Sequence, residues 1–144
     1  MKPATDQNLT SLPHSAQNRC FGCGADNPRG LHLEFFRAGD GTIVCPLEVS
    51  DLYEGPPGYL HGGIIATLLD EAMSKAVRSL GLRAVTRHLE VDYRLPVPSR
   101  TALRLEGARV KSDGHKHWTE ARILDSAGRA LVRGKGLFIE VASH

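Results

Sequence analysis

One stretch of the sequence has the apolar period of a long α-helix, and it limits what the rest of the chain can form. From His61 to Leu80, apolar residues recur three or four positions apart, at 64, 65, 68, 69, 72, 73, 76, 77 and 80. Gly81 follows at the position where a helix commonly ends. We therefore predict one helix of more than about four turns, against which the other elements have to pack.

The remaining segments alternate apolar and polar residues with the period of β-strands. Leu31 to Val49 is predicted as a hairpin that turns at Gly39-Asp40-Gly41, and Pro46 puts its second strand at a sheet edge or a bulge. Short connections after the helix favour antiparallel neighbours. The order fits an α+β fold in which a strongly curved antiparallel sheet of about five or six strands wraps around one long central helix. Further strands are predicted at 89–95, 101–110, 118–124 and 131–141.

Charge and composition exclude several classes of protein. The 144 residues include 18 Lys and Arg against 16 Asp and Glu, a net charge of +2 that is typical of neither a nucleic-acid binder nor an acidic tail. Three cysteines are too few, and odd in number, for a disulfide framework. No apolar run follows Lys2 as in a signal peptide, and none approaches the roughly 18 residues of a membrane span. We expect a cytoplasmic protein without nucleic-acid or membrane partners.

The chain divides into two unequal parts. Residues 1–19 are polar, contain two prolines and show little periodicity, so we expect a flexible N-terminal arm. Residues 20–144 are expected to form one domain, because a chain of this length normally folds as a single unit.

The predicted helix begins with His61-Gly62-Gly63. The first N–H groups of a helix have no internal partner and lie at the positive end of its dipole. Glycines there allow another molecule to approach the backbone, which suits an anion or a developing oxyanion. Alternatively, the glycines only permit a tight turn from the loop into the helix. The spacing favours neither interpretation.

Asp70 lies about 12 Å beyond Gly62 along the predicted helix, and nearly half a turn around it from His61. One small carbonyl group therefore cannot touch Gly62 and Asp70 of the same chain. If both serve one reaction, they come from two subunits of a dimer with antiparallel helices. In the alternative, Asp70 belongs to an ordinary solvated face, on which Glu71 and Lys75 form a surface ion pair.

Three segments carry a resemblance to a known family. The first is Gly55-Pro56-Pro57-Gly58-Tyr59-Leu60-His61-Gly62-Gly63, followed by Leu69-Asp70-Glu71. The others are Cys20-Phe21-Gly22-Cys23-Gly24 ahead of Asn27-Pro28-Arg29-Gly30-Leu31, and Val91-Asp92-Tyr93-Arg94-Leu95-Pro96-Val97-Pro98. Together they resemble the hot-dog-fold acyl-CoA thioesterases of the PaaI-like group, in order from Cys20 to about Val141. The resemblance implies a curved antiparallel sheet around one long helix, an acyl-CoA substrate and no cofactor.

The resemblance also implies roles for three residues. The Gly62 N–H would polarise the thioester carbonyl, and Asp70 of the other subunit would activate water or attack the thioester directly. Thr86, sixteen residues after Asp70, would help to position the water. In the alternative interpretation, Thr86 is simply a β-branched residue of a strand. The expected assembly is a homodimer with active sites at the interface, alone or as a dimer of dimers.

Four further residues belong to the expected site. His61 is expected to fix the loop by hydrogen bonding, while Gly55, Gly58 and Gly63 would contact the substrate. Several relatives carry an asparagine where this chain has Gly55, so either the loop backbone replaces that contact or the oxyanion hole has fewer donors.

Other functions stay open. Cys20-x-x-Cys23 allows a metal or redox interpretation, but structural zinc needs four ligands and the sequence holds no second pair, so we expect a glycine-rich turn and no metal. One alternative is a non-catalytic acyl-CoA-binding module. Whether Asp70 matters to turnover distinguishes it from a thioesterase. A hydratase on the same fold would need an Asp/His pair that the sequence does not present.

Overall fold

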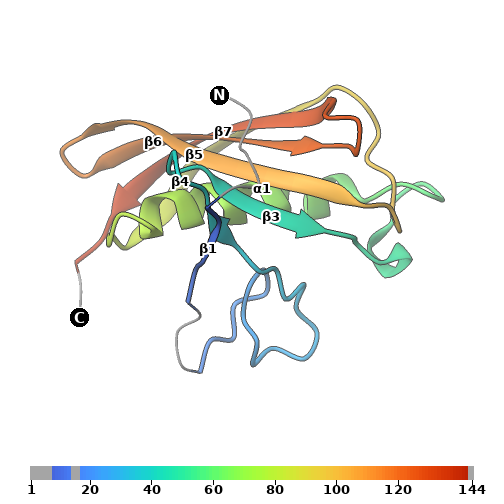
Figure 1. Ribbon diagram of the computed structural model, residues 1–144, viewed down its shortest axis with the longest axis horizontal. Coiled ribbons are helices and arrows are strands. Elements are labelled where there is room, and N and C mark those ends of the chain that lie inside the picture. Colours follow the sequence, from blue (N-terminus) through green and yellow to red (C-terminus); the bar gives the residue numbers. More distant parts are fainter. Residues whose placement is uncertain (1–7, 14–16, 143–144) are drawn as a thin grey trace.

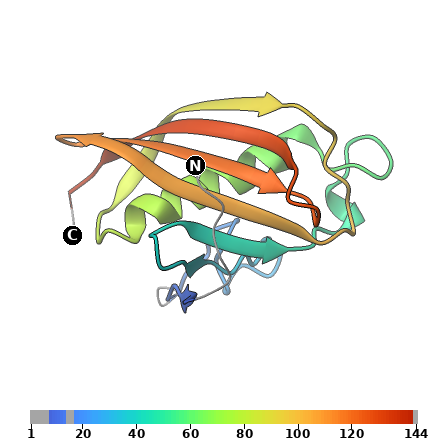
Figure 2. The ribbon, with the colours of Figure 1, turned by 45° about the horizontal axis from the view of Figure 1, so that its top comes forward.

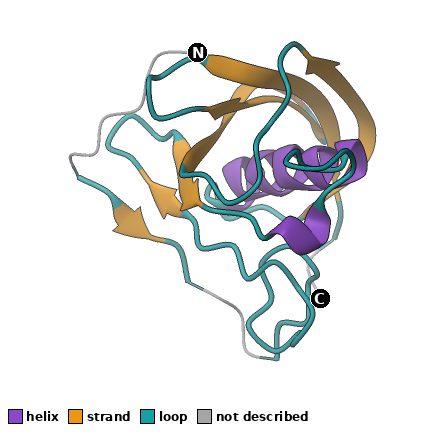
Figure 3. Ribbon diagram, turned by 90° about the vertical axis from the view of Figure 1, so that its right-hand side faces the viewer, coloured by secondary structure: helices purple, strands orange, loops and turns teal. Residues whose placement is uncertain are grey.

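The computed structural model describes residues 8–13 and 17–142, and a single long helix, α1 (Gly62–Arg78), lies at its centre. The helix lies in the concave side of a curved sheet (Figures 1 and 3). His61 is its N-cap and Ser79 its C-cap, and Gly81 follows with a φ of +81°. The predicted helix is confirmed to within two residues at each end.

Seven strands form one sheet in the order β1-β2-β3-β5-β6-β7-β4, with antiparallel neighbours throughout. Figure 2 shows β4 and β3 towards opposite margins of the curved sheet. The α+β architecture is as predicted, but the count exceeds five or six because the segment before residue 20 adds the two-residue strand β1. The strands are β1 (Thr10–Ser11), β2 (Phe36–Arg37), β3 (Ile43–Leu47), β4 (Ala84–Tyr93), β5 (Leu103–Asp113), β6 (Lys116–Leu124) and β7 (Ala130–Glu140).

The predicted hairpin from Leu31 to Val49 is only half formed. Its second strand is β3, and Pro46 lies beyond the residues that β2 pairs, so it occupies the local sheet edge that its missing N–H favours. Leu33 and Phe35 are buried without belonging to a strand. The N–H of Leu33 donates to the Gly22 carbonyl at 2.9 Å, so a loop takes the place of a sheet neighbour. The alternation there reflects packing against the core.

The predicted N-terminal arm, residues 1–19, contributes one short strand. Thr10 and Ser11 of β1 pair with Arg37 and Phe36 of β2, a pairing that the sequence did not indicate. Residues 1–7 and 14–16 of the expected arm lie outside the described residues.

The apolar face of α1 packs directly onto the sheet. Leu68, Leu69 and Met73 are fully buried against strands that present glycines at the points of closest approach. A Cβ on Gly107 of β5 would lie 2.6 Å from the Ala72 carbonyl oxygen. Helix and sheet backbones are therefore closer here than any side chain would allow.

We expect Gly107→Ala to destabilise the fold by about 2 kcal/mol or more, because the added methyl group meets helix backbone that cannot move aside. Urea unfolding monitored by circular dichroism measures the change. Gly39→Ala is the matched control: its Cβ would come no nearer than 3.7 Å to a neighbouring atom, so its free energy of unfolding should stay within about 0.5 kcal/mol of wild type. Equal effects of the two substitutions would contradict this packing.

Candidate active site

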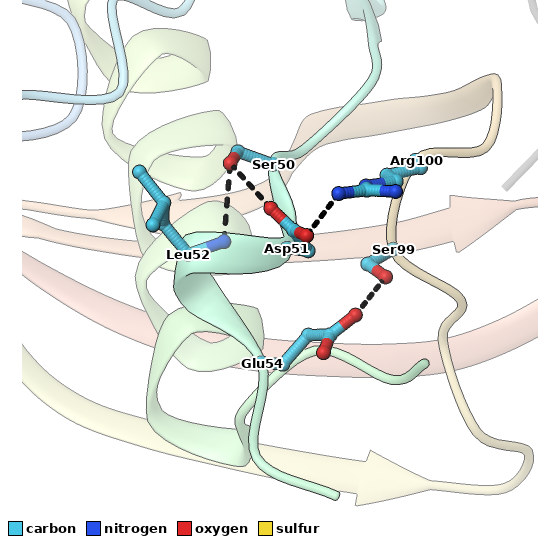
Figure 4. A network of polar contacts seen from close by, with 6 residues as sticks. All are labelled: Ser50, Asp51, Leu52, Glu54, Ser99 and Arg100. Atoms are coloured by element: carbon cyan, nitrogen blue, oxygen red, sulfur yellow. Dashed lines mark hydrogen bonds and ion pairs between the residues drawn. The ribbon is translucent and has the colours of Figure 1, made fainter. Parts of the chain in front are cut away.

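The loop that precedes α1 is anchored to the segment before β5 by polar contacts (Figure 4). It starts with a short 3₁₀ helix, η1 (Asp51–Tyr53), in which the Ser50 hydroxyl accepts the Leu52 N–H at 3.1 Å. Two side-chain contacts then join the loop to the distant segment: Arg100 pairs with Asp51, and the Ser99 hydroxyl donates to Glu54. These contacts fix the position at which the chain enters the helix.

The N-terminus of α1 presents two backbone donors, the N–H groups of Gly62 and Ile64, for which the described residues supply no acceptor. The Gly63 N–H donates to His61 Nδ1 at 2.9 Å, and the His61 N–H donates to the Tyr53 carbonyl at 2.9 Å. Among the described residues, the Gly62 N–H has no acceptor. His61 thus acts as a helix cap, and Gly62 retains the donor that could bind an oxyanion.

The two loop glycines of the predicted site already serve the loop itself. The Gly55 N–H donates to the Tyr59 carbonyl at 3.0 Å, and the Gly58 carbonyl accepts the Ser99 N–H at 3.0 Å. Gly58 has a φ of +86°, which explains why a glycine stands there. Neither the Gly55 N–H nor the Gly63 N–H is left unpaired, so neither can donate to a substrate without breaking an internal bond.

The structure brings Asp70 and Thr86 together. The Thr86 hydroxyl, near the start of β4, donates to Asp70 Oδ1 at 2.6 Å. Asp70 is half-buried while Thr86 is exposed, so the carboxylate lies at the border between the helix and the sheet edge. Asp70 is therefore partly covered, and the Thr86 hydroxyl holds one of its carboxylate oxygens.

Tyr93, at the other end of β4, is a site residue that the sequence did not identify. Its hydroxyl donates to the Gly62 carbonyl at 2.7 Å, and the side chain is 51% exposed. The alternation of Leu89, Val91 and Tyr93 predicts an inward-facing residue. Tyr93 does face the helix, because its ring lies beside Gly62, but it stays half-exposed because β4 is an edge strand.

The predicted ion pair between Glu71 and Lys75 does not form in the described part of the chain. Glu71 Oε1 instead accepts the Cys20 thiol at 3.3 Å, and the Lys75 ammonium lies 6.0 Å from the centre of the Phe35 ring. The N-terminal loop covers this side of the helix, which the i, i+4 spacing alone could not reveal.

Within one chain, the candidate groups form two separate clusters. Gly62 and Asp70 lie eight residues apart on a continuous helix, a separation of about 12 Å along its axis. Gly62 accepts a hydrogen bond from Tyr93, the last residue of β4, and Asp70 accepts one from Thr86, near the start of that strand. One chain therefore holds a backbone donor and a carboxylate that cannot touch one small carbonyl group.

This fold and these motifs identify the family: the chain belongs to the Thioesterase superfamily, whose family model matches residues 57–132. Acyl-coenzyme A thioesterase THEM4 of Xenopus laevis is 32% identical over 108 residues, which are 74% of this chain and 49% of the relative. THEM4 of Rattus norvegicus is 28% identical over 116 residues, which are 78% and 50%. The chain spans about half the length of these curated relatives.

Solved structures share the architecture. A crystal structure of a thioesterase superfamily protein matches with a TM-score of 0.80 at 30% identity, covering 85% of this chain and 60% of that one. The BH2602 protein from Bacillus halodurans, crystallised with CoA, matches with a TM-score of 0.67 at 30% identity, covering 77% and 75%. The expected hot-dog fold is confirmed. Within the described residues, no helix combines the length and apolarity that a membrane span needs.

We expect His61→Ala to lower the free energy of unfolding by about 1 kcal/mol, because it removes the acceptor for the Gly63 N–H. His61→Asn, which offers a good capping oxygen, should retain most of the stability. Chemical denaturation of the three proteins measures both effects. A loss of the same size in both variants would show that His61 stabilises the loop through its ring packing instead.

Proposed function

We propose that this protein hydrolyses acyl-CoA thioesters at a site shared by two copies of the chain. Membership in the thioesterase superfamily supports the reaction class. Curated relatives named acyl-coenzyme A thioesterases, and a relative at 30% identity crystallised with CoA, support the substrate class. The observation that carries the proposal is the bonding of Asp70 and Gly62 to opposite ends of β4.

A two-fold axis through β4 would complete the site. If β4 pairs antiparallel with its counterpart in a second copy, the start of each strand comes opposite the end of the other. Thr86 and Asp70 of one subunit then lie beside Tyr93 and Gly62 of the other. The carboxylate and the backbone donor, about 12 Å apart within one chain, converge on one substrate across the interface.

The outer edge of β4 suits such pairing. It spans ten residues, and within the described chain β7 is the only strand that pairs with it. Val85 and Tyr93 are 54% and 51% exposed, which is unusual for large side chains on a long edge left without a partner. Ala66 lies midway between Gly62 and Asp70 on α1. Its small side chain would allow the α1 helices of the two copies to approach each other near the proposed two-fold axis.

The chemistry requires a base and an oxyanion donor. In one route, Asp70 takes a proton from water as the water oxygen bonds to the thioester carbon; in the other, Asp70 itself bonds to that carbon and water cleaves the resulting anhydride. In both routes the carbonyl oxygen gains negative charge and accepts the Gly62 N–H. In the first route the carbon–sulfur bond then breaks, the proton held by Asp70 passes to the leaving sulfur, and CoA and the carboxylic acid are released. In the second route the carbon–sulfur bond breaks as the anhydride forms and CoA leaves as the thiol, and the acid is released when water cleaves the anhydride. The Thr86 hydroxyl holds the Asp70 carboxylate in position.

We expect Asp70→Asn to lower kcat by at least about 100-fold with a similar KM, because the amide can neither take a proton nor attack. The measurement is release of free thiol from short, medium, long and aromatic acyl-CoAs, with wild type alongside. Asp92→Asn, on the exposed face of β4, is the control and should keep wild-type turnover. Acyl-CoA binding without turnover by wild type would instead identify a non-catalytic acyl-CoA-binding module.

Gly62→Pro removes the proposed oxyanion donor while leaving the helix intact. Proline is favoured at the first helical position, and His61 already has the φ of −61° and ψ of 138° that a residue before proline prefers. We expect kcat to fall by about 10²–10³-fold. Gly62→Ala, which keeps the N–H and meets no atom closer than 3.6 Å, should remain within a few-fold of wild type.

Hybrid dimers test the sharing of the site. A dimer of one Asp70→Asn and one Gly62→Pro subunit contains one intact site and one doubly altered site. Equal mixing after subunit exchange should therefore restore about a quarter of wild-type activity from two inactive proteins, because half the dimers are hybrids with one working site each. If mass spectrometry verifies subunit exchange and no activity returns, the site is not shared between subunits. The assignment as a hydrolase would then be decided by the Asp70→Asn measurement alone.

A further inference from the structure

The loop from Cys20 to Gly24 is a compact turn whose backbone surrounds a sulfur atom. The Gly24 N–H donates to the Cys20 carbonyl at 2.8 Å, closing the turn. Asn18 supports both cysteines: its Oδ1 accepts the Cys20 N–H at 3.0 Å, and its Nδ2 donates to Cys23 Sγ at 3.6 Å. Cys23 is buried and Cys20 half-buried, and neither forms a disulfide.

Glu71 of α1 completes a cluster with these two thiols. Cys20 Sγ, Cys23 Sγ and a Glu71 carboxylate oxygen all lie within 4.8 Å of one another. Glu71 can approach because position 22 is glycine: a Cβ there would lie 2.3 Å from Glu71 Cγ. The Glu71 side chain therefore lies against the backbone of the turn, in space that the methyl group of an alanine at position 22 would occupy.

The cluster has negative character and lacks an opposing positive charge. Within the described residues, no Lys or Arg pairs with Glu71. A divalent cation would supply the positive charge that Glu71 lacks, and a thiol that coordinates a metal is deprotonated by it.

We propose that Cys20, Cys23 and Glu71 bind a divalent transition-metal cation of borderline softness, with Zn²⁺ as the representative ion. Two thiolates and one carboxylate are typical zinc ligands. Tetrahedral zinc with Zn–S of about 2.3 Å and Zn–O of about 2.1 Å holds sulfur and oxygen about 3.6 Å apart. Cys20 Sγ and Glu71 Oε1 are 3.3 Å apart here. The fourth position is left to solvent.

The metal would join the N-terminal loop to the middle of the helix. Each thiol releases its proton to solvent on binding, so up to two protons leave per ion. The sequence pattern did not reveal this cluster because its third ligand follows Cys20 by 51 positions and lies on a helix, away from any second cysteine pair. The inference concerns a site separate from the proposed hydrolysis and does not depend on it.

Cobalt titration of the full chain tests the site. The purified protein is reduced with a phosphine, stripped with a chelator and titrated with Co²⁺, and Zn²⁺ is then added in competition. We expect one Co²⁺ per chain, a thiolate-to-cobalt charge-transfer band in the near ultraviolet, and loss of the band on adding Zn²⁺. Cys20→Ser and Cys23→Ser should each weaken binding by at least about 100-fold.

Three further variants separate ligation from folding. Gly22→Ala keeps every ligand but displaces the Glu71 carboxylate, so binding should weaken by about 10-fold. Glu71→Gln should weaken it at least as much. Cys45→Ala is the control, because Cys45 is buried on β3, where burial raises its thiol pKa to about 12, and it lies outside the cluster. It should bind metal as wild type does.

Several outcomes would overturn the inference. The inference is wrong if no charge-transfer band appears while a thiol assay shows that the cysteines are reduced. It is also wrong if Cys20→Ser binds Co²⁺ as tightly as wild type does. A disulfide that forms in preference to metal binding would identify a redox pair instead. If a cysteine variant unfolds by circular dichroism, the comparison of Gly22→Ala with Cys45→Ala decides, since both keep the three ligands.

Discussion

The close contact between α1 and the sheet determines where every functional group lies. The helix approaches β5 so nearly that only a glycine fits at position 107, and β7 likewise presents Gly134 and Gly136 beneath the helix. Close-packed backbones leave little freedom for a helix to slide or turn. The residues on the uncovered sides of α1 therefore have fixed directions, one toward β4 and another toward the N-terminal loop.

The position of β4 turns this fixed helix into a site that is open to a second molecule. As the edge strand, β4 contributes Thr86 and Tyr93 to the helix but leaves its outer side without a strand neighbour in the described chain. A carboxylate half-buried at such an edge has protein on one side only. Within one chain the carboxylate and the backbone donor stay apart, which is the physical basis for proposing a shared site.

The sequence predicted the elements with strong periodicity and missed contacts between distant segments. The period of α1 fixed its limits to within two residues, and the strands predicted at 101–110, 118–124 and 131–141 overlap β5, β6 and β7. The family resemblance implied that Thr86 acts beside Asp70, but only the fold shows the 2.6 Å bond between them. The role of Tyr93 depends on which strand forms the sheet edge, and alternation carries no information about that. Leu33 shows the converse: burial produced a strand-like pattern where no strand exists.

Asp70 and Glu71 are consecutive residues with contacts on two different sides of α1. Successive helical side chains point about 100° apart, so one residue is bonded to β4 and the next to the cysteine loop. Any rotation of the helix about its own axis would strain both bonds together. The direction of the Asp70 side chain is consequently held from two sides, by β4 through Thr86 and by the N-terminal loop through the neighbouring Glu71.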